Sequence, residues 1–417
     1  MTNADTVTRS VGRRELHVVA IRILVLNAGS SSLKFQVVAP QTGEVTLGGH
    51  VDRIGSTSAS VAVTAGGRTH EHQVDVPDHD AALVQMARHV GEADTGDLLA
   101  VGHRVVHGGT RFVGPVVVDD RVLSGIEELA RLAPLHNPPA AAGIRAARSS
   151  FPGVPQVAVF DTAFFAALPA AAATYAVPRD LAHREQLRRY GMHGTSHQYV
   201  AGEVARFLGR GLGGLDQVVL HLGNGASAAA IRGGAPADTS MGLTPLEGLV
   251  MGTRPGDVDP GLVLHLLRHG GEDGGPLGPD ATEELLHRRS GLEGLLGAHD
   301  FREVLAAVDR GDGAAVLALD VYCHRIRKYV GAYLAVLDGA DVVTFTGGVG
   351  ENVPRVRALA LARLDRLGIE LDSVRNAAAD TGPRIISTER SRVTVLVVPT
   401  NEELAIARQV ADLVGGG

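Results

Sequence analysis

The chain has 417 residues, of which 39 are Lys or Arg and 46 are Asp or Glu, and its formal net charge is −7. A chain of this length usually divides into two domains. Its acidic balance argues against a general nucleic-acid binder, which needs excess Lys and Arg. The single cysteine, Cys323, excludes an intramolecular disulfide framework and is typical of the reducing cytoplasm. No apolar run reaches the roughly eighteen residues of a transmembrane helix, so we expect no membrane partner.

Residues 1–20 form a polar segment that contains the twin arginine Arg13-Arg14. Together with the apolar run of residues 18–26, this segment has features of a secretory signal. However, Arg22 interrupts that run, and the run is needed as a core strand. We therefore expect residues 1–20 to be a disordered extension.

A polar turn between two apolar runs follows this segment. Residues 27–32 read Asn-Ala-Gly-Ser-Ser-Ser, and a second apolar run begins after Lys34. This pattern predicts a strand, a turn and a strand. Small residues let the backbone approach an anion, and the N–H groups, the Ser32 hydroxyl and the Lys34 ammonium can donate to phosphate oxygens. We expect this loop to hold a nucleotide phosphate.

Residues 217–231 repeat this arrangement, with His-Leu-Gly-Asn-Gly at residues 221–225 between two apolar runs. We expect Asn27 and Asn224 to occupy the same place in two copies of one unit. Such a repeat indicates a duplicated domain whose two loops grip a polyphosphate across a cleft. Two unrelated hairpins are the alternative, because Asn-Gly is a common hairpin turn.

Charged residues lie on or after several predicted elements of the chain. The strand at residues 100–106 contains Arg104, and Asp161 stands at the carboxyl end of a buried strand, where ligands collect in open α/β sheets. Residues 238–260 are too polar and irregular for a core element. They are a functional-loop candidate with Arg254 at its tip.

Two further strands lead into helices near the end of the chain. Residues 340–346 run into a glycine turn at 347–350 and then a helix from about Pro354. A glycine turn at a helix N-terminus is a natural seat for a nucleotide, although this one lacks the third glycine of a dinucleotide fingerprint. The last helix begins with Glu402 and Glu403, where the helix dipole alone would favour acids.

Two histidine pairs, His103/His107 and His193/His197, have the spacing that zinc ligands use on a helix. Both pairs lie among glycines and β-branched residues, the His-Glu-x-x-His pattern is absent, and the sequence identifies no third ligand. We therefore favour histidines that donate to phosphate or are satisfied within the core.

Five motifs, in one order along the chain, resemble those of the acetate kinases. They are residues 27–34, 102–108, 189–197, 221–225 and 399–403. The resemblance implies an α/β fold of duplicated actin-like ATPase (ribonuclease H-like) domains with an interdomain cleft, as in the acetate and sugar kinase, Hsp70 and actin superfamily. ATP would bind in that cleft.

The resemblance also implies a domain division. Residues 21–162 together with residues 397–417 are expected to form a discontinuous N-terminal domain. Residues 163–396 would form the C-terminal domain, with nucleotide-binding and dimer contacts. Residues 1–20 have no counterpart in the usual family pattern.

The implied activity is reversible phosphoryl transfer between ATP and acetate, giving acetyl phosphate and ADP by direct in-line transfer. The resemblance implies Mg²⁺ as the metal, with Mn²⁺ as the alternative ion. It further implies a homodimer in the cytoplasm and a part in acetyl-CoA biosynthesis.

Residue roles follow from the same resemblance. Arg104 and Arg254 would hold the acetate carboxylate and the transferring phosphoryl group, because the planar guanidinium matches both. The expected catalytic residues are Asp161, Arg104, Arg254 and His193. The expected acid-binding residues are Arg104, Val106, Leu135, His136, Met192 and Pro245. The expected nucleotide-binding residues are Ser32, Lys34, His221, Gly223, Asn224, Gly225, Asp300, Phe301, Arg302, Gly348, Gly350, Glu351 and Asn352. The expected metal ligands are Asn27 and Glu402.

Three positions depart from the family pattern. Met192 stands where phenylalanine is usual, Phe165 where histidine is usual and Pro255 where serine is usual. Because methionine is adaptable, a propionate or other short-chain acyl kinase is the alternative within the family. An actin-like or Hsp70-like ATPase that acts as a binding protein is the alternative from another class. Without the resemblance, Arg104 would be a buried ion-pair partner and Asp161 a cap.

Overall fold

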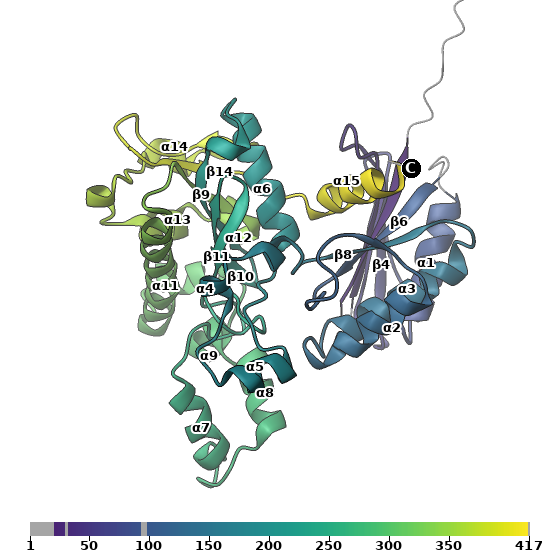
Figure 1. Cartoon of the computed structure of the whole chain (residues 1–417), viewed down its shortest axis with the longest axis horizontal. Coiled ribbons are helices and arrows are strands. Elements are labelled where there is room, and N and C mark those ends of the chain that lie inside the picture. The colour runs from purple at the N-terminus through teal and green to yellow at the C-terminus, as the bar shows by residue number, and fades with distance from the viewer. Residues whose placement is uncertain (1–20, 30–31, 93–97, 416–417) are drawn as a thin grey trace, which may run out of the picture.

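The computed structural model describes residues 21–29, 32–92 and 98–415. These residues form two halves, each built around one mixed β-sheet, and the halves lie side by side in Figure 1. The expectation for residues 1–20 lies outside the described residues. So do the two serines at 30–31 of the first polar turn.

The first half contains an eight-stranded sheet of order β5-β4-β3-β2-β1-β6-β8-β7. Leu24 and Leu26 of β1 pack toward α1 and α3, whereas Ile23 and Val25 pack toward α15 on the other face. Apolar residues on both faces of β1 therefore explain why this strand is buried between helices (Figure 1). The strands are β1 (Arg22–Ala28), β2 (Ser32–Val38), β3 (Val45–Asp52), β4 (Ser60–Ala65), β5 (Arg68–Gln73), β6 (Leu98–Val105), β7 (Val116–Val117) and β8 (Gln156–Phe160). The helices are α1 (His79–Glu92), α2 (Asp120–Glu128), α3 (Asn137–Ser150) and α15 (Glu402–Gly415).

The second half contains a six-stranded sheet of order β11-β10-β9-β12-β14-β13. The long helix α11 (Gly313–Leu337) packs on one face, against Val218 and Leu220 of β9, and α6 (Gly194–Phe207) packs on the other face, against Val219. The strands are β9 (Asp216–Leu222), β10 (Ala226–Arg232), β11 (Ala235–Thr239), β12 (Val342–Thr346), β13 (Arg384–Ile385) and β14 (Thr394–Val397).

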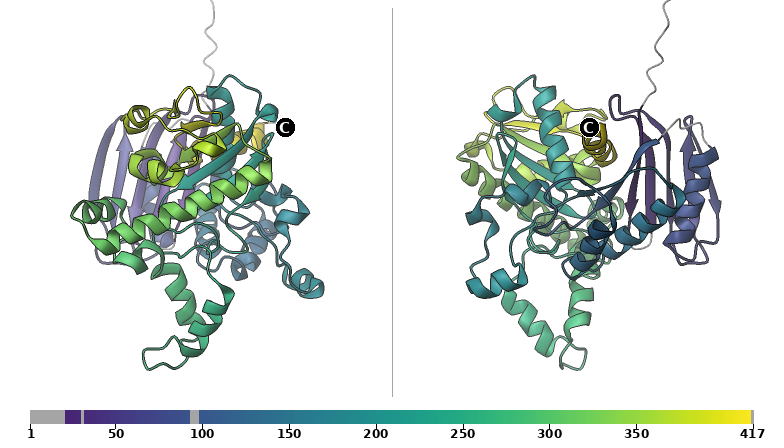
Figure 2. Two further views of the ribbon diagram at one scale, coloured as in Figure 1. Left: turned by 90° about the vertical axis from the view of Figure 1, so that its left-hand side faces the viewer. Right: turned by 45° about the vertical axis from the view of Figure 1, so that its right-hand side comes forward.

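The remaining helices of the described chain are short. Among them, α7 and α8 form an arm that projects away from both sheets (Figure 2). They are α4 (Ala170–Ala173), α5 (Arg179–Glu185), α7 (Pro260–His269), α8 (Pro279–Arg288), α9 (Gly291–Leu296), α10 (Phe301–Asp309), α12 (Gly347–Asn352), α13 (Pro354–Leu361) and α14 (Ser373–Ala377), with 3₁₀ turns at Leu129–Arg131, Phe164–Ala167, Leu212–Gly214 and Asp365–Leu367. None of the helices in the described ranges is both long and apolar enough to cross a membrane.

The two sheets share one central topology. The orders β3-β2-β1-β6-β8 and β11-β10-β9-β12-β14 have the same pattern, in which the first three strands are antiparallel neighbours and the last two join in parallel. The duplicated fold predicted from the sequence is therefore confirmed, and two unrelated hairpins are excluded.

The predicted match of Asn27 with Asn224 is wrong. Asn27 is still paired in the sheet, opposite Lys34, whereas Asn224 lies beyond the last paired residue of β9, Leu222. Counted from the last paired residue, His221 is the counterpart of Asn27. The turn between β1 and β2 has one residue more than the turn between β9 and β10. The two asparagines therefore occupy different structural positions.

Two helices cross between the halves: each follows the last strand of one sheet in the chain and packs on the other sheet. Helix α6 follows β8 of the first sheet but packs on β9, and α15 follows β14 of the second sheet but packs on β6 and β1. The two helices also contact one another. This exchange brings residues from both ends of the chain to the region between the halves. The domain boundaries at 162/163 and 396/397 stay a prediction.

The glycine turn at 347–350 is itself helical. Gly347 has φ of +77° and begins α12, so the helix starts before the predicted Pro354, which begins α13. A Cβ on Gly347 would lie 2.8 Å from the carbonyl oxygen of Leu222. Glycine is therefore needed here for both its conformation and its size.

Candidate active site

A cavity of about 250 Å³ lies where the carboxyl ends of β1, β6 and β8 meet the loops of the second half. It brings together most residues expected for catalysis and acid binding. These lining residues are Arg104, Val106, His136, Asp161, Met192, His193, Pro245 and Arg254, and the expected metal ligand Asn27 lines the cavity as well. Leu135 does not line the cavity, because the turn before α3 directs its neighbour His136 there and leaves Leu135 half-buried elsewhere.

Arg104 and Asp161 form a two-pronged ion pair at the floor of this cavity. The parallel pairing of β6 with β8 aligns Arg104 with Val159 and leaves Asp161 just past the strand end. Arg104 Nη2 donates to Asp161 Oδ2 at 2.7 Å, and Arg104 Nε lies 3.1–3.2 Å from both carboxylate oxygens. Asp161 is 1% exposed. Such geometry holds the guanidinium in one orientation.

A second carboxylate approaches Arg104 from the last helix. Glu402 Oε2 lies 3.5 Å from Arg104 Nη1. Burial opposes the charges of all three groups, yet the two carboxylates raise the pKa of Arg104 and the Arg104 charge lowers the pKa of Glu402. Burial raises the pKa of Asp161 against the opposing effect of Arg104. The other oxygen of Glu402, Oε1, is buried and has no hydrogen-bond partner within residues 21–29, 32–92 and 98–415.

His193 faces the cavity from the start of α6 in a left-handed conformation, with φ of +59°. Its Nδ1 shares a 3.0 Å hydrogen bond with Ser227 Oγ, and its ring lies 4.4 Å from that of His221, centroid to centroid. Burial and the neighbouring His221 and Arg104 lower the pKa of His193 well below its usual value. His193 is therefore a neutral hydrogen-bonding group at pH 7.

His136 is also neutral at physiological pH. Burial, followed by the charge of Arg254, lowers the pKa of His136 to about 4. Arg254 contributes a cation to the opposite side of the cavity. Within residues 21–29, 32–92 and 98–415, no carboxylate forms an ion pair with Arg254, and the one hydrogen bond of its side chain runs from Nη1 to the sulfur of Met251 at 3.8 Å. The charge of Arg254 is therefore available to an anionic ligand.

The paired histidines form hydrogen bonds with side chains and with the backbone. His103 Nε2 bonds Gln156 Oε1 at 2.8 Å, and His107 Nδ1 accepts from Gly109 N–H at 3.0 Å. In the part of the chain that the structure describes, no group of three His, Cys, Asp or Glu side chains is arranged to hold a metal ion. The histidines serve the core and the cavity instead.

A second cavity, of about 590 Å³, lies beside the first on the side of the second half. It gathers most residues expected on the nucleotide side. These are Gly223, Asn224, Asp300, Phe301, Arg302, Gly348 and Asn352. The backbone N–H of Gly252 donates to Asn224 O at 2.9 Å, so the loop that carries Arg254 is tied directly to the second polar turn.

Several expected nucleotide residues lie elsewhere. Gly350 is buried against Phe345 and Leu222, and Glu351 caps the strand-to-helix turn by accepting from Gly347 N–H at 2.8 Å and Thr400 N–H at 3.1 Å. His221 packs behind His193 and bonds Ser196 at 2.8 Å. Gly225 lines the first cavity rather than the second.

Lys34 and Ser32 do not line either cavity. Leu33 and Phe35 of β2 pack toward α1. Because side chains alternate along a strand, Lys34 lies on the opposite face, in a depression beside Gln36 and Glu403. Its charge still contributes to the lowered pKa of Glu402. Ser32 begins β2, and its carbonyl accepts from Gly29 N–H at 2.8 Å. Lys34 is therefore not part of the wall of either cavity.

The sequence model of the acetokinase family matches residues 22–408. This chain belongs to the acetokinase family. The acetate kinase of Leifsonia xyli subsp. xyli is 53% identical over 400 residues, which cover 95% of this chain and 99% of that protein. The crystal structure of Porphyromonas gingivalis acetate kinase superimposes with a TM-score of 0.85 at 41% identity, covering 93% of this chain and 98% of that one. A propionate kinase from Francisella tularensis superimposes with a TM-score of 0.86 at 37% identity and the same coverage.

Several residues that line or support this cavity were not predicted from the sequence. Met241 lines the cavity, Thr195 donates to Asp161 Oδ1 at 3.3 Å, and Ser227 bridges His193 and His197. Met241 lies in the irregular loop at residues 238–260, which the sequence predicts to be a functional loop. Thr195 lies in the first turn of α6 and Ser227 near the start of β10, and nothing in their spacing distinguishes them from ordinary polar residues.

Proposed function

We propose that this protein transfers the terminal phosphoryl group of ATP reversibly to acetate, giving acetyl phosphate and ADP. The observation that carries the proposal is the convergence of Arg104, Arg254 and neutral His193 on one small cavity between two ATPase-like halves. The 53% identity to an acetate kinase supports acetate as the acid.

Acetate would lie with its carboxylate toward the arginines and its methyl group toward an apolar wall of Val106, Met192 and Pro245. An acetate oxygen attacks the γ-phosphorus, and the bond from that phosphorus to the bridging oxygen breaks. ADP then leaves with that oxygen. A carboxylate is already a nucleophile at pH 7, so no base is needed. Because the transition state spreads negative charge over equatorial oxygens, fixed cations are the main requirement.

Asp161 acts in this proposal as the group that orients Arg104. Its two-pronged contact fixes the guanidinium plane, while Arg254, which lacks such a partner among the described residues, follows the phosphoryl group. His193 and His136 add neutral donors without adding charge. Their low pKa values keep this role unchanged across physiological pH.

Glu402 and Asn27 would hold a divalent metal, for which we propose Mg²⁺, with Mn²⁺ as the alternative ion. The buried Oε1 of Glu402, which has no hydrogen-bond partner among the described residues, fits this role. Asn27 and the Glu402 partner Arg104 both line the cavity. Magnesium is commonly bound by one or two carboxylates together with phosphate oxygens and water. When bound, it would neutralise charge on the polyphosphate.

The adenosine side is proposed to bind in the second cavity, between Asp300–Arg302 and Gly348–Asn352. We further propose that the protein acts as a homodimer in the cytoplasm, where acetyl phosphate would serve acetyl-CoA biosynthesis. The resemblance supports these assignments, and the single cysteine supports the cytoplasmic location.

Trapping acetyl phosphate with hydroxylamine tests the activity. With ATP, Mg²⁺ and acetate, we expect hydroxamate to form in proportion to enzyme, and omission of acetate should abolish it. ATP hydrolysis that proceeds without acetate and without hydroxamate would favour an actin-like ATPase. A higher kcat/KM for propionate than for acetate would favour the propionate kinase alternative, which the structural likeness to the Francisella tularensis protein keeps relevant.

A further inference from the structure

A buried arginine outside the cavity joins the two chain segments that form its apolar wall. Arg189 belongs to the segment that carries Met192, and the facing segment carries Met241 and Pro245, which also line the cavity. Arg189 does not line the cavity, and its side chain is only 17% exposed.

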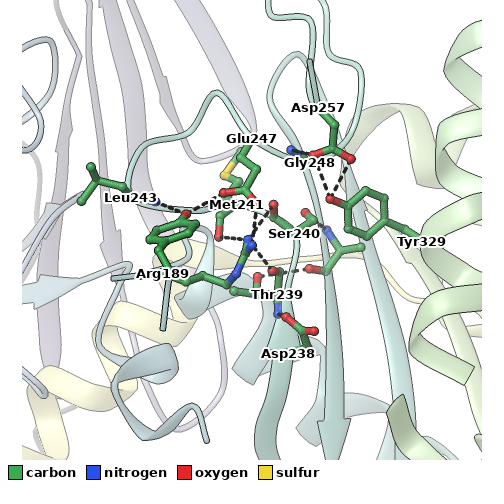
Figure 3. Close-up of polar contacts among 12 residues, drawn as sticks. Arg189, Asp238, Thr239, Ser240, Met241, Leu243, Glu247, Gly248, Asp257 and Tyr329 are labelled. Carbon is green, nitrogen blue, oxygen red and sulfur yellow. Dashed lines mark hydrogen bonds and ion pairs between the residues drawn. The ribbon is translucent and has the colours of Figure 1, made fainter. Parts of the chain in front are cut away.

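The guanidinium of Arg189 holds the facing segment at several points. Its Nη1 lies 3.1 Å from the carbonyl oxygen of Thr239 and 3.2 Å from those of Ser240 and Met241. Its Nη2 forms an ion pair with Glu247, as Figure 3 shows. One side chain therefore binds the chain both before and after residues 242–246, which contain Pro245.

Tyr175 extends this cluster to the same turn. Its hydroxyl donates to Glu247 Oε2 at 2.6 Å and accepts from Leu243 N–H at 3.0 Å. Gly242 lies against these groups, because a Cβ there would be 2.0 Å from Glu247 Oε2 and 2.1 Å from the Tyr175 hydroxyl. The backbone of the two segments is also joined, since Tyr190 N–H donates to Gly242 O at 3.0 Å.

We infer that Arg189, together with Glu247, is a positioning residue that sets the size of the acid pocket by holding the Met241–Pro245 wall against Met192. The inference rests on the proposed function. An arginine suits the task because its planar fork reaches backbone carbonyls on one side and a carboxylate on the other. A lysine supplies one point charge and cannot serve both sides at once.

The test compares acids of different length in Arg189→Met and Arg189→Lys. For Arg189→Met we expect the KM for acetate to rise about tenfold, and the acetate-to-propionate ratio of kcat/KM to fall about fivefold or more. A hydrophobic pocket normally discriminates between substrates that differ by one methylene by roughly 10- to 200-fold in kcat/KM, and a loosened wall should lose part of this discrimination. The KM for ATP should stay within about twofold, and Arg189→Lys should lie between the wild type and Arg189→Met.

Gly242→Ala provides a second variant that leaves Arg189 in place. The added Cβ displaces Glu247 and Tyr175, so we expect the acid ratio to fall in the same direction. This variant keeps the inference testable if Arg189→Met does not fold.

Arg325→Met is the matched control. Arg325 is a similarly buried arginine on α11, and it donates to Gly248 O and Asp257 O, both at 3.1 Å, at the base of the Arg254 loop. Loss of the Arg325 side chain should lower kcat because it loosens the loop that carries Arg254. The acetate-to-propionate ratio of kcat/KM should stay unchanged. An unchanged ratio in Arg189→Met, or an equal shift in Arg325→Met, would overturn the inference. A wild-type protein that forms no hydroxamate would instead overturn the proposed function.

Discussion

At the scale of the residue, the two arginines that line the cavity differ in which groups hold them. Arg104 is fixed by Asp161 and Glu402, whereas Arg254 has no carboxylate partner among the described residues and burial lowers its pKa. Arg104 is therefore part of a buried charge network, and Arg254 is a cation that awaits an anionic ligand. Substitution should separate these two situations.

For Arg254→Ala we expect kcat to fall on the order of 10³-fold, the loss typical of an arginine that stabilises a phosphoryl-transfer transition state. The urea midpoint should change little, because no buried carboxylate loses its partner. Steady-state kinetics and equilibrium unfolding of the same preparation measure both quantities. A loss confined to the KM for acetate would show that Arg254 binds only the ground state.

Arg104→Ala should lose at least as much activity and also destabilise the fold by about 3–5 kcal/mol. The reason is that the substitution leaves Asp161 buried without its partner. The double variant Arg104→Ala/Asp161→Asn is the control. It should recover stability without recovering activity, and full stability of the single variant would contradict the ion-pair network.

At the scale of the element, helix α15 connects the end of the chain to the first sheet and carries Glu402 in its first turn. It packs closely because β6 has a glycine beneath it. A Cβ on Gly102 would lie 2.9 Å from both Ile406 Cγ2 and Val410 Cγ2. The absence of a side chain at one strand position therefore sets how near Glu402 comes to Arg104.

Gly102→Ala should destabilise the protein by about 1–3 kcal/mol through overpacking and should raise the Mg²⁺ concentration needed for half-maximal activity. Gly202→Ala is the control, because Gly202 lies within α6 and its Cβ would contact nothing within 4 Å. That substitution should stabilise by roughly 0.5–1 kcal/mol. Thermal unfolding and a Mg²⁺ titration check both effects, and an unchanged titration in Gly102→Ala would contradict the link to Glu402.

At the scale of the whole molecule, buried neutral histidines make stability depend on pH. Burial lowers the pKa of His103 and of His107 to about 4, from an ordinary value of 6.5. Between these values the unfolded chain binds protons that the folded chain does not, so stability falls as pH drops from 6.5 toward 4. At pH 5 each of these two histidines should cost about 2 kcal/mol relative to pH 7.

Urea unfolding at pH 7 and pH 5 measures this dependence. His103→Gln can still donate to Gln156 and does not titrate, so its stability should fall by about 2 kcal/mol less than that of the wild type over the same interval. Equal slopes for the two proteins would show that His103 is not the group responsible.

Local patterns along the chain determined the elements and the family of this protein. Residues 23–26 are all apolar, which predicts a strand buried on both faces. The repeat at residues 217–231 predicts a second copy of the same strand–turn–strand unit. Arg104, Asp161, His193 and Arg254 stand in motifs whose residue types already suit phosphoryl transfer. Their roles remain predictions until they are substituted.

Only the tertiary structure decided which of these residues meet. Asn27 and Lys34 belong to one motif and are paired across β1 and β2, yet Asn27 lines the cavity and Lys34 lines a separate depression beside Gln36 and Glu403. The packing of α15 on β6 brought Glu402 to Arg104 across almost 300 positions of the chain. Arg189 bonds the segment that leads to the Met241–Pro245 wall through the backbone carbonyl oxygens of residues 239–241. Backbone carbonyls are present at every residue, so the sequence does not reveal these bonds. Such contacts are set by long-range packing, and local composition therefore does not encode them.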